Sequence, residues 1–102
     1  MKFPTRFALV LTVAASAPVA SFAGPIEQAC LRSDRPSANR AVCGCVQDAA
    51  NLTLTKGDQQ LAASFFKNPQ RAQDIRQSDR SSHESFWQRY KEFGEAAESF
   101  CG

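Results

Sequence analysis

Four cysteines in a chain of 102 residues are the feature that most constrains what this sequence can fold into. Cys30, Cys43, Cys45 and Cys101 all follow an N-terminal segment that has the pattern of an export signal. An even number of cysteines in a short exported chain indicates a disulfide framework. Such cross-links matter because a domain of this size buries only a thin apolar core.

Residues 1–23 have the three parts of a bacterial signal peptide. Lys2 and Arg6 supply positive charge, Phe7–Ala15 is apolar, and small side chains occupy the positions that a signal peptidase reads. The apolar run is shorter than the roughly 20 residues that a transmembrane helix needs. We therefore expect cleavage after Ala23 and a soluble periplasmic or secreted protein without stable membrane insertion.

Cleavage would leave residues 24–102 as a single domain. Lys2 and Arg6 are two of the 12 basic residues, so the basic residues of that domain equal its 10 acidic residues in number. Domains that bind nucleic acids are normally strongly basic. The neutral charge therefore argues against a nucleic-acid partner.

The pairing of the cysteines follows in part from their spacing. A Cys43–Cys45 bond would close a small, strained ring, so Cys30 pairs with one of these two and Cys101 with the other. Residues two apart on a helix point about 200° apart, which lets Cys43 and Cys45 face different neighbours. We favour Cys30–Cys43 with Cys45–Cys101. In an antiparallel hairpin that turns near Arg35, Cys43 lies closer to Cys30 than Cys45 does. The swapped pairing stays open, since loop entropy is nearly the same for both.

The cysteines allow two other interpretations. A thiol redox pair at Cys43 and Cys45 would usually sit at a helix start, where the dipole lowers the thiol pKa, and this pair falls within a predicted helix. A zinc site needs four thiolates or added histidines, and the only histidine, His83, is distant in the sequence. We expect no metal and no cofactor.

The apolar pattern predicts an all-α fold, a small bundle of four or five short helices joined by two disulfides. Ser37 is a candidate N-cap, and Thr55 with Asp58 and Ser81 with Glu84 have the spacing of capping boxes. The helices are expected over residues 25–32, 38–52, 56–67, 69–77 and 82–101.

The last of these helices has the clearest apolar stripe. At 100° per residue its inward positions fall within about 60° of one line. These positions are Phe86, Tyr90, Phe93, Ala97, Phe100 and Cys101. The third helix is expected to bury Leu61, Ala62, Phe65 and Phe66, and the fourth Ala72 and Ile75.

No Ser/His/Asp order, paired-carboxylate motif or Gly-rich phosphate loop is present in the sequence, so we expect no enzymatic activity. The polar stretch Gln70–Arg80, with the residues that follow it, is either a solvated face with local ion pairs or a surface for a partner protein or small ligand. The candidate surface consists of Arg71, Arg76, Asp79, Glu84 and Trp87.

A series of short motifs covers nearly all of residues 24–102. In order they are Cys43-Gly44-Cys45, Thr53-Leu54-Thr55, Asp58-Gln59, Phe65-Phe66, Asn68-Pro69, Ser78-Asp79, Phe86-Trp87-Gln88-Arg89-Tyr90, Phe93-Gly94 and Cys101-Gly102. This series resembles an uncharacterised family of small exported four-cysteine proteins from marine and related alphaproteobacteria, often named "arginine transporter". The resemblance implies a periplasmic location and paired cysteines.

The sequence therefore predicts a periplasmic, non-enzymatic domain that acts by binding a protein or a small ligand. One alternative is an accessory protein for uptake of arginine or another basic amino acid, as the family name implies. Arginine binding needs acidic groups with an aromatic ring, and Asp79, Glu84 and Trp87 are the local candidates. The other alternative is a thiol-disulfide redox protein that uses Cys43 and Cys45.

Overall fold

The structure, a computed structural model, describes residues 23–102, and these residues form five α-helices and no strand. The helices are α1 (Pro25–Arg32), α2 (Arg40–Thr53), α3 (Lys56–Lys67), α4 (Pro69–Arg76) and α5 (Ser81–Cys101). The all-α prediction is confirmed. The predicted export signal lies outside the described residues except for Ala23.

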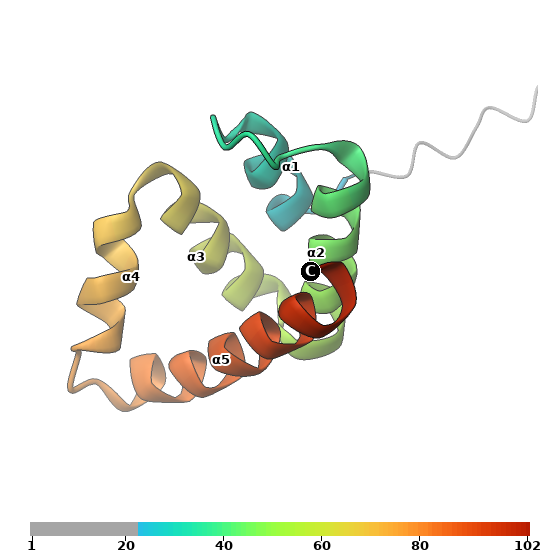
Figure 1. The fold of residues 1–102 in the computed structure, drawn as a ribbon. Helices are drawn as coiled ribbons and strands as arrows, with labels where there is room; N and C mark the ends of the chain where they lie inside the picture. The colour runs from blue at the N-terminus through green and yellow to red at the C-terminus, as the bar shows by residue number, and fades with distance from the viewer. Residues whose placement is uncertain (1–22) are drawn as a thin grey trace, which may run out of the picture.

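The helices form a bundle in which α5 connects two ends of the molecule (Figure 1). At one end α1 packs against α2 and α3, and the C-terminal part of α5 packs against α2. At the other end α4 packs against α3 and the start of α5. Within residues 23–102, no helix combines the length and the apolar character that a membrane span requires.

The disulfides are Cys30–Cys43, which joins α1 to α2, and Cys45–Cys101, which joins α2 to the last residue of α5. Their Cα atoms are 5.6 and 5.7 Å apart, the usual spacing for disulfides. This is the pairing that the sequence favoured. Because the two α2 cysteines are two residues apart, their side chains leave the helix in different directions and reach different neighbours.

The second helix begins two residues later than predicted. Its N-cap is Asn39, whose side-chain oxygen accepts a hydrogen bond of 2.9 Å from the backbone N–H of Val42. Ser37 lies instead in the preceding turn, where its backbone carbonyl accepts a hydrogen bond from the side-chain amide of Asn39. Asn is as good an N-cap as Ser, so sequence preference alone did not separate the two positions.

One of the two predicted capping boxes is present. Thr55 and Asp58 bond reciprocally, with both hydrogen bonds at 3.1 Å, and α3 starts at Lys56. The predicted box of Ser81 with Glu84 is wrong, because the N-cap of α5 is Arg80 and no side chain caps it. The backbone carbonyl of Arg80 accepts from the N–H groups of His83 and Glu84 instead.

An aromatic cluster forms the core between α3 and α5. Phe65 meets the rings of Phe86 and Tyr90 edge-on, with centroids 5.9 and 5.4 Å apart, a favourable geometry for aromatic rings. Phe86 and Phe93 are buried as predicted. Phe100 was predicted to face inward but is 72% exposed. It precedes Cys101 by about 100° of helix turn, so directing Cys101 toward α2 turns Phe100 to solvent.

A bidentate ion pair also joins α3 to α5. The guanidinium of Arg89 donates to both carboxylate oxygens of Asp58, at 2.6 and 3.0 Å. Asp58 is buried, whereas the Arg89 side chain is 39% exposed. The hydrogen bond from Arg89 lowers the pKa of Asp58, and burial of the carboxyl opposes this effect only in part. The same carboxylate therefore caps α3 and holds α5 against it.

Removing either disulfide should destabilise the domain by an amount that increases with the length of the loop that the disulfide closes. The Cys45–Cys101 loop spans 56 residues and the Cys30–Cys43 loop spans 13. Replacing Cys45 and Cys101 together by alanine should lower the free energy of unfolding by about 4 kcal/mol, and replacing Cys30 and Cys43 by about 3 kcal/mol. Urea denaturation of both double variants measures this. A larger loss for the shorter loop would contradict the entropic explanation.

Asp58→Asn should destabilise the domain at neutral pH by about 1 kcal/mol, at the low end for a charged pair because Arg89 is partly exposed. The folded-state pKa of Asp58 lies below the ordinary value of 3.8. Its stabilising effect is therefore complete above that value and is lost as the pH falls through the lower folded pKa. Urea denaturation from pH 7 to pH 2 measures this. The free energy of unfolding should fall less on acidification in Asp58→Asn than in the exposed control Asp48→Asn.

Candidate functional site

An apolar groove of about 280 Å³ opens between α2, α3, α5 and the segment that connects α1 to α2. We call it the aromatic groove. Its walls are mostly apolar side chains from four helices, α1 included, among them Val42, Val46, Phe65, Phe66, Tyr90 and Phe93. The groove is partly open to solvent.

Small side chains make room for the aromatic groove. Ala62 of α3 and Ala97 of α5 line it, where larger residues would fill the space. Val42 and Val46 of α2 are apolar, yet both are only partly buried because they line the groove. Further along α2, Ala49 and Ala50 are buried, at 2% and 0% exposure.

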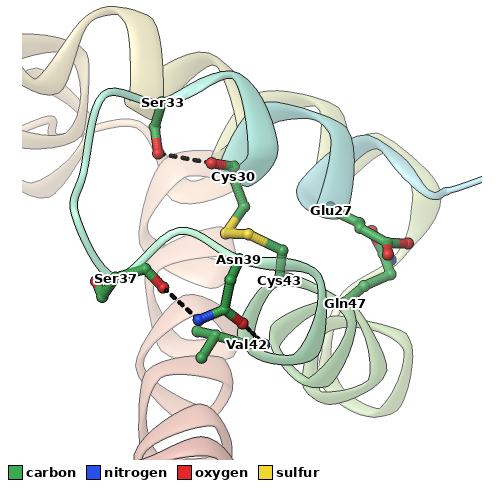
Figure 2. The surroundings of a disulfide bond; sticks show 8 residues. All are labelled: Glu27, Cys30, Ser33, Ser37, Asn39, Val42, Cys43 and Gln47. Carbon is green, nitrogen blue, oxygen red and sulfur yellow. Dashed lines mark hydrogen bonds between the residues drawn. A yellow bond between two sulfur atoms is a disulfide. The ribbon is translucent and has the colours of Figure 1, made fainter.

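The segment between α1 and α2 forms the rim of the groove. The Cys30–Cys43 disulfide closes the base of this segment, and Figure 2 shows Ser33 and Ser37 on the loop that it closes. The hydroxyl of Ser33 donates to the carbonyl of Cys30 at 2.6 Å. Asn39 anchors the other end of the loop through its N-cap bond (Figure 2). The rim is therefore held at both ends.

Arg35 is the one charged side chain among the residues that line the groove. Its guanidinium carbon lies 5.4 Å from the centroid of the Phe66 ring, within the range of a cation–π contact. Within residues 23–102, no carboxylate lies close enough to Arg35 to form an ion pair. The rim thus presents a positive charge beside an apolar wall.

Tyr90 lies on the α5 side of the groove, between the rings of Phe65 and Phe93. Burial raises the pKa of its phenol, and the charge of Arg35 opposes that rise. The phenol is therefore neutral at physiological pH. Among the hydrogen bonds within residues 23–102, none involves its hydroxyl. Because no buried side-chain oxygen of these residues lacks a partner, the hydroxyl is accessible to solvent.

A second hollow, near the start of α1, is polar. Gln47 accepts from the backbone N–H of Glu27 at 2.9 Å and donates to Asn51 and Gln59, at 2.9 and 2.7 Å. It thereby satisfies an N–H of the first turn of α1 from another helix. A Cβ on Gly24 would come within 2.4 Å of the Gln47 amide, so a larger residue there would displace that amide from its hydrogen bonds. Because these amides bond to one another, the cluster is structural.

The candidate surface predicted from sequence is spread over three elements. Arg71 and Arg76 lie on α4, Asp79 lies in the connection to α5, and Glu84 lies in the first turn of α5; all four are exposed. Trp87 is partly buried, with its ring 5.2 Å from that of Tyr90. No ion pair joins these residues within the described chain, and none of them lines the aromatic groove. Arginine binding at this surface stays a prediction.

Cys43 and Cys45 are each bonded to a distant cysteine and not to each other. All four cysteines are paired, and Cys43 has no exposed surface. The disulfide that a redox pair at Cys43 and Cys45 would form is therefore not part of this structure. Among residues 23–102, no group of three or more His, Cys, Asp or Glu side chains is arranged to hold a metal ion.

Comparison with protein families, curated proteins and solved structures finds no match to this chain. The site therefore rests on its own geometry. Sequence reasoning assigned Arg35 to a turn and Tyr90 to the core, and so missed the groove. The small size of the apolar residues that recur along α2, Val42, Val46 and Ala49, was the one signal that could have indicated a hollow beside this helix.

Tyr90→Phe should change the free energy of unfolding by no more than about 0.5 kcal/mol, because the hydroxyl has no described partner to lose. Phe86→Ala should cost about 3–5 kcal/mol, because Phe86 is only 2% exposed. Urea denaturation of the two variants tests whether Tyr90's hydroxyl is free. A loss of 2 kcal/mol or more in Tyr90→Phe, roughly that of an unsatisfied buried group, would show that it bonds within the protein.

Proposed function

We propose that this protein is a soluble, non-enzymatic periplasmic domain that binds one small amphipathic molecule in the aromatic groove. The observation that carries the proposal is the groove itself, a hollow of about 280 Å³ with aromatic walls and a rim closed by a disulfide. Cavities of this kind, with mostly apolar walls and few polar groups, are the usual form of small-ligand sites.

The cross-links support this proposal in two ways. Disulfides persist in oxidising compartments such as the periplasm, which fits the export signal expected in residues 1–23. Cys30–Cys43 and Cys45–Cys101 also hold α1, α2 and α5 in place around the groove. A site that is already ordered loses less conformational entropy when its ligand binds.

The size of the groove favours a small molecule over a protein partner. Stable protein interfaces use roughly 20–30 residues on each side, whereas the groove is lined by 14 residues. The volume of the groove, about 280 Å³, lies just below the roughly 300–1,000 Å³ of typical ligand pockets, so it suits only a small ligand. Arginine would need carboxylates beside its guanidinium, and the groove lining includes none.

Ala38→Phe should weaken ligand binding about tenfold or more, because Ala38 lines the groove and a benzyl group would occupy its opening. Ala41→Phe is the matched control, since Ala41 is exposed on α2 and does not line the groove. Calorimetric titration of both variants and the unchanged protein with 1-octanol, a neutral probe, measures the effect. Equal octanol affinity in all three proteins, or no binding by any, would contradict the proposal.

A further inference from the structure

The aromatic groove carries one uncompensated charge. Arg35 is the charged residue of its lining, and no carboxylate of residues 23–102 lies within ion-pair distance of it. By contrast, Arg89 is matched by Asp58 through two hydrogen bonds. Other cations of the described chain are also free of ion pairs, but Arg35 is the one that lines the aromatic groove, where a ligand can neutralise it.

The position of Arg35 suits contact with one end of a ligand. The Phe66 ring, 5.4 Å from the guanidinium carbon, keeps the charge beside the apolar wall. The N–H donors of the guanidinium match the two oxygens of a carboxylate. Tyr90 also lines the groove, near enough for the charge of Arg35 to lower the pKa of its phenol.

The rest of the groove lining determines the chemical character of the other end of the ligand. Beyond Arg35, Ser33, Ser37 and the Tyr90 hydroxyl, the groove is walled by aliphatic and aromatic side chains. A second charged group on the ligand would be desolvated there without a partner, which is costly. The lining thus favours a molecule with a single negative charge and an apolar body.

We infer that the aromatic groove binds a free monocarboxylate with a short aliphatic or aromatic body, whose carboxylate pairs with Arg35. This inference rests on the proposed function and names its ligand class. The apolar body lies against Val46, Phe65 and Phe93, and the carboxylate meets the rim that the Cys30–Cys43 disulfide holds. The groove discriminates against cationic amphiphiles of the same length, because Arg35 repels them.

The test compares three probes of equal chain length, octanoate, 1-octanol and octylammonium, by calorimetric titration of the full mature protein. Octanoate should bind about fivefold more tightly than octanol, the usual advantage of one partly exposed charged contact. Octylammonium should bind more weakly than octanol. In Arg35→Gln the advantage of octanoate should disappear while octanol affinity is unchanged.

Arg40→Gln is the matched control, because it removes the same charge from an exposed α2 position outside the groove lining. This variant should keep the octanoate preference. Octanol binding without any octanoate preference, or a preference that survives Arg35→Gln, would overturn the inference and leave the proposed groove function standing. Absence of binding by all three probes would overturn both. Melting temperatures of the variants confirm that each is folded.

Discussion

The two disulfides that leave α2 in different directions are the constraint on which the rest of this structure depends. Cys43 reaches back to α1 and Cys45 reaches the last residue of α5. Covalent bonds therefore define α1 and the end of α5 as neighbours of α2. Because these bonds hold α2 in place, the helix needs to bury little apolar surface. Its buried side chains include the small residues Ala49 and Ala50.

The aromatic groove follows from this arrangement. A domain held only by its core would need large side chains between α2 and α5, since small chains have little apolar area to bury. With cross-links at Cys43 and Cys45, α2 presents valines and alanines, and the space beside them stays open. The aromatic residues instead gather between α3 and α5, where Phe65, Phe86 and Tyr90 pack edge-on or stacked. They form both the core and one wall of the groove.

Polar groups complete the packing where apolar ones are lacking. Asp58 caps α3 and pairs with Arg89 of α5, so one carboxylate connects two helices. Gln47 of α2 satisfies an N–H at the start of α1 and bonds to Gln59 of α3. Buried polar groups stabilise a fold only when their bonds are satisfied. In the described residues, every buried side-chain nitrogen and oxygen has a partner.

The sequence by itself determined the helical class, the order of the helices and the favoured cysteine pairing. Local signals sufficed for these: apolar residues at helical spacing, the Thr55 and Asp58 capping box, and the two-residue step from Cys43 to Cys45. Only the tertiary structure decided that Phe100 faces solvent, that Asp58 meets Arg89 across 31 residues of chain, and that Arg35 stands beside Phe66 and Tyr90 at a groove. These features depend on how helices cross, which residue spacing along one helix does not specify.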